Sequence, residues 1–303
     1  MTPTRAFAAL LLLVLLVPSS AIACSQCMCG SPLPAQYLWG PEPDRFRFGL
    51  EERYLSKKNA LDQEPGHEDE REHRVSGFAL WHPSPRALFV ARVPYAFKEL
   101  REHPEGEATI REKASGFANA EVTAAFQALQ SINGNGRVSS LTLVGGVQMP
   151  TGQDNKKDDA GDRLEEHLQP GSGAWTESVG AIATVPLGTG AFEVDALGRW
   201  NGTNDFGYQY GNAFLANAGY STRLYGRWQF LGFANARVAE RDVQDREDLV
   251  HTGGTMIYAA PGLRYWSRGP WVADLAVQIP VVSNLYGDQT EHTTGRLSLS
   301  FAP

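Results

Sequence analysis

Residues 191–201 read AFEVDALGRWN, and this stretch decides the fold class. Small or apolar residues occupy every second position, namely Phe192, Val194, Ala196, Gly198 and Trp200. The positions between them hold mostly polar residues, namely Glu193, Asp195, Leu197, Arg199 and Asn201. Side chains of a β-strand point alternately to opposite faces of its sheet. The stretch therefore predicts a strand with one apolar and one polar face.

The same period of two recurs along the chain from residue 45, and no segment has a convincing helical period. About twelve segments carry it: 45–55, 73–82, 86–97, 115–128, 138–149, 173–187, 191–201, 211–225, 228–240, 253–266, 271–281 and 294–301. A tilted strand needs about 9–11 residues to cross a bilayer, whereas the mean strand of a soluble protein has about 5–6. Segment length favours a transmembrane barrel over a soluble β-sandwich.

The connections between these segments alternate between long and short. The long or polar ones are 56–72, 98–114, 150–172, 202–210, 241–252 and 282–293, and most of the others are tight turns such as 83–85, 188–190 and 226–227. Short periplasmic turns facing long external loops, with an even number of strands, are typical of bacterial outer-membrane barrels. We predict an all-β, transmembrane, antiparallel up-and-down β-barrel of about twelve strands in contact with outer-membrane lipids.

Bulk composition agrees with a barrel, although the mean hydropathy is −0.30 and 20% of the residues are charged. Only alternate residues of a barrel strand contact lipid, so such a chain looks soluble on average. The net charge of −7 and the acidic loops argue against nucleic-acid binding.

The first residues are typical of a secretory signal peptide. An apolar run follows Arg5, and Ala21-Ile22-Ala23 matches an A-x-A cleavage site, so we predict a signal peptide over 1–23 and export to the outer membrane. Residues 24–44 contain four prolines and three cysteines without sustained alternation, which predicts a Cys/Pro-rich periplasmic segment outside the barrel wall. The barrel itself is predicted over 45–303.

The cysteines, Cys24, Cys27 and Cys29, all lie in this N-terminal segment. Three roles stay open: lipidation of Cys24, binding of a soft metal ion by the thiols, or a disulfide that anchors the tail. No cofactor is predicted.

Charged residues recur on the polar faces of the predicted strands. The candidates for lining the lumen are Arg47, Arg53, Arg92, Glu121, Glu193, Asp195, Arg199, Arg223, Arg237, Arg264 and Asp274. An arginine near the bilayer midplane costs about 2–4 kcal/mol on the lipid-facing side, so these charges must face inward. They either pair into ladders that fill the barrel or line a narrow wet path. Glu193, Asp195, Arg199 and Arg223 lie on neighbouring strands and can meet in one cluster, which either constricts a pore or forms buried structural pairs.

Two short motifs flank the third long loop. Pro150-Thr151-Gly152 ends the fifth strand, and Leu168-Gln169-Pro170-Gly171-Ser172-Gly173 leads into the sixth. Together they resemble the signature of a family of outer-membrane transporters named after the meta-pathway of phenol degradation. Where that family has a Gly-x-Gly-Asp-like segment, this chain has SGFAN at 115–119. We interpret Pro150, Thr151, Gly152, Pro170, Gly171 and Gly173 as residues that shape the loop rather than contact a substrate.

The resemblance implies an outer-membrane channel that admits a small molecule, in some members a hydrophobic or aromatic one; the substrate of this chain is unknown. The last strand also resembles the C-terminal signal read by the barrel-insertion machinery, because Leu297, Leu299 and Phe301 alternate with polar residues, although Ala302-Pro303 follow. The predicted function is passive passage, not catalysis. The alternatives are a closed structural or metal-associated barrel and, in third place, an outer-membrane lipid hydrolase.

Against the hydrolase, the chain has no G-x-S-x-G motif, and His82 lies at the periplasmic end of its predicted strand. The other six histidines fall in predicted long loops or, for His73, at the edge of one, and the richest tract is 64–73. A run of charges of this kind is usually a solvated loop, so we interpret the tract as a loop rather than a metal site.

Overall fold

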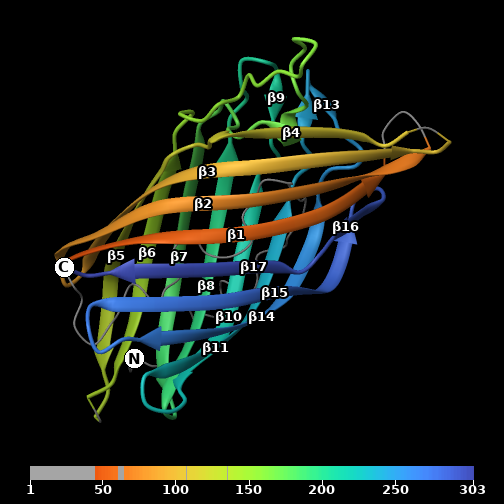
Figure 1. The fold of residues 1–303 in the computed structure, drawn as a ribbon. Coiled ribbons are helices and arrows are strands. Elements are labelled where there is room, and N and C mark those ends of the chain that lie inside the picture. Colours follow the sequence, from red (N-terminus) through yellow and green to blue (C-terminus); the bar gives the residue numbers. More distant parts are fainter. Residues whose placement is uncertain (1–44, 61–64, 107, 135) are drawn as a thin grey trace.

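The computed structural model describes residues 45–60, 65–106, 108–134 and 136–303, which form a closed antiparallel β-barrel (Figure 1). The strands of the wall are β1 (Phe46–Ala60), β2 (Gly66–Ser84), β3 (Ala87–Pro104), β4 (Ile110–Phe117), β5 (Glu121–Ile132), β6 (Val138–Gln148), β7 (Thr176–Leu187), β8 (Gly190–Asn201), β10 (Ala213–Arg223), β11 (Trp228–Ala239), β14 (Gly254–Trp266), β15 (Trp271–Leu285), β16 (Gln289–Glu291) and β17 (Thr294–Phe301). The N-terminal predictions, including the signal peptide and the three cysteines, lie outside the described residues.

Each wall strand pairs with its neighbours in the chain, and β1 closes the sheet by pairing with both β2 and β17. Two positions around the wall are each shared by two strands. β5 and β4 follow one another along β3, and β17 and β16 follow one another along β1. The 14 strands of the sheet therefore make the 12 positions of the barrel, which confirms the predicted fold class.

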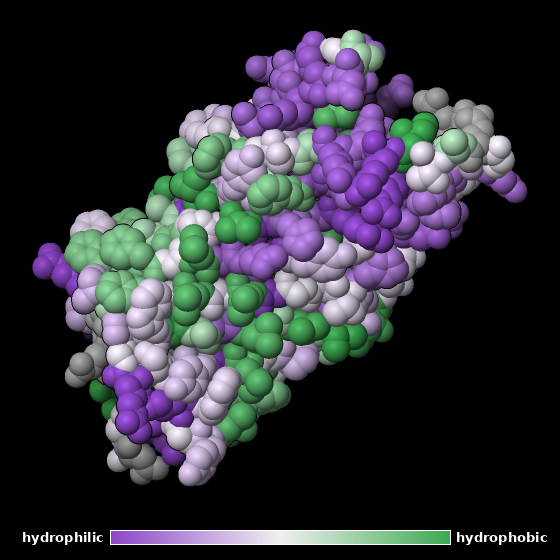
Figure 2. Space-filling model, in the orientation of Figure 1, coloured by the Kyte–Doolittle hydropathy of each residue, from purple (hydrophilic) through white to green (hydrophobic). Residues whose placement is uncertain are grey.

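The outer face carries an apolar band. Exposed large apolar side chains point outward from every part of the wall, for example Leu50, Val93, Phe126, Phe214 and Leu297. Aromatic pairs mark the edge of the band at the short turns: Trp228 packs against Tyr265, and Trp271 against Phe301. Figure 2 shows hydrophobic residues over the wall and hydrophilic ones over the loops and the ends of β1–β3. No helix in the described part of the chain is long and apolar enough to cross a membrane.

Several predicted loop boundaries are wrong, because the first strands run well past the apolar band. The predicted loop 56–72 is mostly strand: β1 continues to Ala60 and β2 begins at Gly66. The predicted loop 98–114 shrinks in the same way between Pro104 and Ile110. Outside the membrane both faces of a strand are polar, so the alternation that marks a strand in the sequence disappears there while the backbone pairing continues.

Three short strands lie in the external loops. β9 (Tyr208–Gln209), β12 (Val243–Gln244) and β13 (Glu247–Asp248) form a small separate sheet in the order β13-β12-β9. A 3₁₀ turn, η2 (Glu166–Leu168), is the only helical element that the structure assigns in the described residues. The C-terminal end lies at the opposite, short-turn end of the barrel (Figure 1).

Candidate functional site

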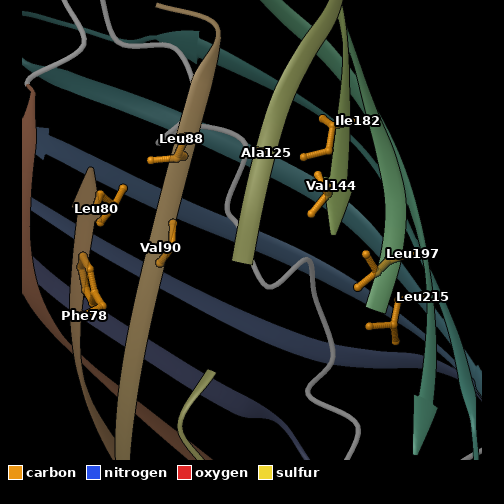
Figure 3. Close-up of a cluster of buried hydrophobic side chains, with 9 residues drawn as sticks. All are labelled: Phe78, Leu80, Leu88, Val90, Ala125, Val144, Ile182, Leu197 and Leu215. Carbon is orange, nitrogen blue, oxygen red and sulfur yellow. The ribbon is translucent and has the colours of Figure 1, made fainter. Parts of the chain in front are cut away.

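One side of the inner face carries an apolar cluster among polar side chains such as Thr123, Thr142 and Asn217. Nine buried, mutually packed side chains belong to seven neighbouring strands, β2, β3, β5, β6, β7, β8 and β10: Phe78, Leu80, Leu88, Val90, Ala125, Val144, Ile182, Leu197 and Leu215 (Figure 3). They occupy the inward positions of strands whose outward positions are also apolar in the band. We name this set the apolar wall. The expectation of polar residues inside therefore holds only in part for this half of the barrel, where apolar inward residues alternate with polar ones such as Asp195 and Asn217.

The rest of the inner face, on β11, β14, β15, β17 and β1, is polar and ionic, and we name it the charged side. Arg264 Nε donates to Asp274 Oδ1 at 2.5 Å, and the two residues are 1% and 3% exposed. Asp274 also accepts a hydrogen bond from the Ser298 hydroxyl at 3.2 Å, so one carboxylate joins β14, β15 and β17. Removing two charges from water is costly unless they are paired and hydrogen-bonded, and here both conditions hold.

A second buried ion pair lies towards the external end of the charged side. Arg237 of β11 pairs with Glu291 of β16, and the Tyr258 hydroxyl of β14 donates to the same carboxylate. The prediction had included Arg237 among the candidates without a partner. Glu291 had been missed because the sequence gives no alternation around this three-residue strand.

The remaining charged candidates also lie on inward positions but are less tightly bound. Arg53 contacts Glu51 at 3.5 Å, and Arg92 contacts Glu121 at 3.9 Å across β3 and β5. Arg47 donates to the Ser300 hydroxyl at 3.2 Å. Each of these contacts joins residues of the same strand or of neighbouring strands, so none of them spans the barrel interior.

The predicted cluster of Glu193, Asp195, Arg199 and Arg223 does not form as one group. Arg199 is opposite Ala213 at one end of β10, whereas Arg223 is opposite Gln229 at the other end, so the two arginines cannot act together. Arg199 instead donates to the Gln148 side chain of β6 at 2.5 Å. The pairing register between β8 and β10 places the two arginines apart. This register cannot be read from the order of residues along a single strand.

Asp195 also has a neutral partner. It accepts a hydrogen bond of 2.6 Å from Asn217 Nδ2, the residue directly opposite it on β10. Glu193 lies nearer the short-turn end.

A cavity of about 700 Å³ opens at the short-turn end of the barrel, between β7, β8, β10, β11 and β14. Its lining is mixed and includes Glu193, Arg223, Arg264, Leu231, Phe233 and Trp266. The guanidinium of Arg264 lies 5.4 Å from the centre of the Trp266 ring, within the range of a cation–π contact. The cavity joins apolar surface to a few charged groups, which suits an amphipathic small molecule.

The external end is covered by a cap, which we define as the segment 149–175 together with the loop strands β9, β12 and β13. Leu164 and Leu168 pack against Leu100 of β3 and Ala114 of β4. From there the segment reaches the opposite wall, where the Tyr210 hydroxyl donates to the Glu166 carbonyl at 3.0 Å and Asn204 Nδ2 donates to Glu166 Oε1 at 2.7 Å. The cap therefore bridges the mouth from β3 to the start of β10.

The cap buries an imidazole. Lys98 Nζ donates to the His167 carbonyl at 2.6 Å, and the Tyr208 hydroxyl lies 3.4 Å from His167 Nε2 while it donates to Asp242 Oδ2 at 2.6 Å. Burial lowers the pKa of His167 below its ordinary value of 6.5, and the positive charge of Lys57 acts in the same direction. Neutral imidazole is the favoured state in the closed cap.

The signature residues at both ends of segment 149–175 meet at Asn119, the middle one of the three residues between β4 and β5. The Gly152 amide donates to Asn119 Oδ1 at 3.1 Å, and Asn119 Nδ2 donates to the Ser172 hydroxyl at 2.7 Å. The Thr151 hydroxyl accepts from the Ala120 amide at 2.9 Å. A Cβ on Gly152 or Gly171 would lie under 3.0 Å from the other glycine's backbone, so the two chains approach each other more closely than side chains allow.

These contacts give the motifs a local structural account, in which Pro150 and Pro170 lie at the ends of the segment and Gly173 has a φ of +66°. Asn119 had not been singled out as a functional residue, although it stands where the resembled family has its Gly-x-Gly-Asp-like segment.

Comparisons with known proteins agree with this architecture. A family model described as "Putative MetA-pathway of phenol degradation" matches residues 81–279. An outer membrane channel from Pseudomonas putida F1 superposes with a TM-score of 0.66 at 10% identity, over 89% of this chain and 99% of that one. The transport unit of the autotransporter AIDA-I from Escherichia coli gives 0.51 at 13% identity, over 93% and 95%. No curated protein matches the sequence.

Proposed function

Because the chain belongs to the family described as "Putative MetA-pathway of phenol degradation", we propose that it is an outer-membrane channel for passive passage of a small hydrophobic molecule. The structural similarity to a protein named as an outer membrane channel supports the fold of such a channel. The observation that carries the proposal within this chain is the apolar wall.

The apolar side chains inside the barrel indicate which class of solute the channel favours. The nine side chains of the apolar wall are only 2–8% exposed, because they pack on one another. A solute that displaces some of these contacts meets apolar surface, which lowers the free energy of a hydrophobic solute relative to water. The apolar wall therefore favours a hydrophobic solute over an ion or a sugar.

The two ends of the barrel fit this path. The cavity at the short-turn end combines Trp266, Leu231 and Phe233 with charged groups, and can hold a solute between the apolar wall and the periplasm. At the external end the solute must pass the cap. Passage then depends on movement of the segment 149–175 or on a gap beside it.

The experiment is uptake by whole cells with an intact lipopolysaccharide leaflet, because that leaflet resists hydrophobic solutes and simple liposomes do not. Cells that express the chain should take up a neutral labelled aromatic such as toluene faster than cells with an empty vector. Leu197→Asn combined with Leu215→Asn should reduce the rate severalfold. Gln278→Asn, a conservative change of an inward residue on β15 that does not line the cavity, is the control.

A closed structural barrel is the second candidate, and the buried Arg264–Asp274 and Arg237–Glu291 pairs favour it. That candidate predicts equal uptake by expressing and empty-vector cells when gels show a folded, heat-modifiable barrel. Such a result would overturn the channel proposal. No step of either candidate uses a catalytic residue.

A further inference from the structure

The ends of β2 and β3 that extend past the apolar band carry a group of possible metal ligands. The last large apolar outward residues are Val75 on β2 and Phe97 on β3. Beyond them the same outward faces carry His67, Asp69 and His103. His67 is directly opposite His103 in the pairing of the strands, and Asp69 is the next outward residue along β2. The group lies outside the barrel wall on the external side, separate from the interior described above.

The geometry of the three side chains suits a single ion. One ligand atom of each residue lies within 4.8 Å of those of the other two, and His103 Nε2 is 3.4 Å from Asp69 Oδ2. A tetrahedral zinc ion with ligand bonds of about 2.0–2.1 Å separates its ligand atoms by about 3.3–3.4 Å. The His103–Asp69 distance therefore already matches two ligands of one ion, and a small rotation of the His67 side chain supplies the third.

A neighbouring hydroxyl fixes the orientation of one imidazole. Thr109 Oγ1 lies 3.1 Å from His103 Nδ1, which leaves Nε2 pointing at Asp69. Hydrogen bonding of the second ring nitrogen is the usual way in which proteins orient a metal-binding histidine. The backbone is also held, because pairing continues past Gly66 and Pro104 to a hydrogen bond of 2.8 Å from the Glu105 amide to the Pro65 carbonyl.

The ligand chemistry selects the class of ion. Two imidazoles and one carboxylate suit zinc, copper(II) or nickel, whereas magnesium and calcium prefer oxygen ligands alone. The side chains of His103 and Asp69 are 33% and 29% exposed, so an ion can reach them from solvent. Three protein ligands also leave a coordination position for water or another ligand.

We propose that His67, Asp69 and His103 bind a divalent transition-metal ion of the zinc class at the external rim of the β2–β3 hairpin. This inference is independent of the channel proposal. The sequence did not indicate this site, because the tract 64–73 was interpreted as a loop. His67 and His103 are 36 positions apart in the sequence, and only the strand register places them together.

Isothermal titration of zinc into the full-length, untagged protein in detergent tests the proposal. The cysteine thiols are first alkylated so that they do not compete for the ion. We expect a saturable site, and His67→Gln or His103→Gln should weaken it by more than about 100-fold, since loss of an orienting partner alone costs about 10–100-fold. Thr109→Val should weaken zinc binding by about 10–100-fold, because it removes only the orienting partner of His103.

His73→Gln is the matched control. His73 is also an outward histidine on β2, but its neighbours are Glu52, at 3.1 Å from Nδ1, and the ring of Tyr54. Zinc affinity should be unchanged in this variant. An electron paramagnetic resonance spectrum of bound copper(II) should show coupling to two imidazole nitrogens in the parent protein and to one in His67→Gln. Equal affinities of the parent and His103→Gln would overturn the proposal, as would absence of saturable binding to a heat-modifiable barrel.

Discussion

The apolar wall and the charged side lie inside the same barrel and are stabilised in different ways. The apolar wall consists of side chains that pack on one another across β2 to β10, whereas the charged side holds few, specific pairs such as Arg264–Asp274. Lipid contact constrains only the outward face of each strand. The inward face is free to be apolar or ionic, provided that apolar groups pack and charges find partners.

The comparison also holds along single strands. β2 and β3 carry Phe78, Leu80, Leu88 and Val90 on their inward face within the membrane band. Further out, the inward residues of the same strands are charged, and Lys98 lies 3.7 Å from Glu72. A solute that moves along this wall would therefore meet a charged mouth first and an apolar surface afterwards.

The largest effect should come from breaking a pair on the charged side. Asp274→Ala leaves the fully buried Arg264 guanidinium without its carboxylate, and removal of one partner of a buried pair costs about 3–5 kcal/mol. The free energy of unfolding, measured by urea titration in lipid vesicles, should fall by this amount. Arg223 is an exposed residue that, like Arg264, lines the cavity at the short-turn end. Arg223→Ala should change the free energy of unfolding by no more than about 0.5 kcal/mol. A small effect of Asp274→Ala would mean that water reaches the pair.

A smaller effect should come from the apolar wall. Ile182 of β7 is 2% exposed, and Ile182→Val removes one methylene from a packed cluster, which typically costs about 0.5–1.5 kcal/mol. The same urea titration measures it. An outward residue in contact with lipid, tested as Ile279→Val, is the control for loss of the same group outside the cluster. Equal costs at both positions would argue that the apolar wall is not packed as a cluster.

The smallest effect should be confined to the cap and should depend on pH. The pKa of His167 is lowered in the closed cap, chiefly by burial, so the opened segment takes up a proton first as the pH falls below 6.5. The contribution of neutral His167 to the stability of the cap is complete above pH 6.5 and decreases below it. Lys57 and Lys98 reinforce the effect, whereas Glu70 and Asp242 oppose it.

Hydrogen exchange of residues 149–175 at pH 7.5 and pH 5.5 measures this change, and protection should be lower at pH 5.5. His167→Gln should reduce the difference. Burial raises the pKa of the adjacent Glu166, which gains stability on acidification and therefore acts in the opposite direction. A pH dependence that persists unchanged in His167→Gln would assign it to another group.

The sequence by itself determined the barrel and its number of strands. Contact with lipid requires apolar residues at alternate positions of every crossing strand, and stretches such as 191–201 carry that pattern locally. The alternation of long and short connections then indicated which ends face outward. The PTG and PGSG motifs indicated that the segment between them leaves and rejoins the wall, and the structure places both motifs around Asn119.

Only the tertiary structure decided which inward residues meet. Arg199 and Arg223 appear close in a strand-by-strand interpretation, yet the register puts them at opposite ends of β10. His67 and His103 appear to lie in separate loops, yet they are cross-strand partners. Where a strand is polar on both faces, as before His73, the period of two vanishes from the sequence. The facing of those residues is then fixed by backbone pairing with neighbouring strands, which is a property of the closed sheet and not of the segment.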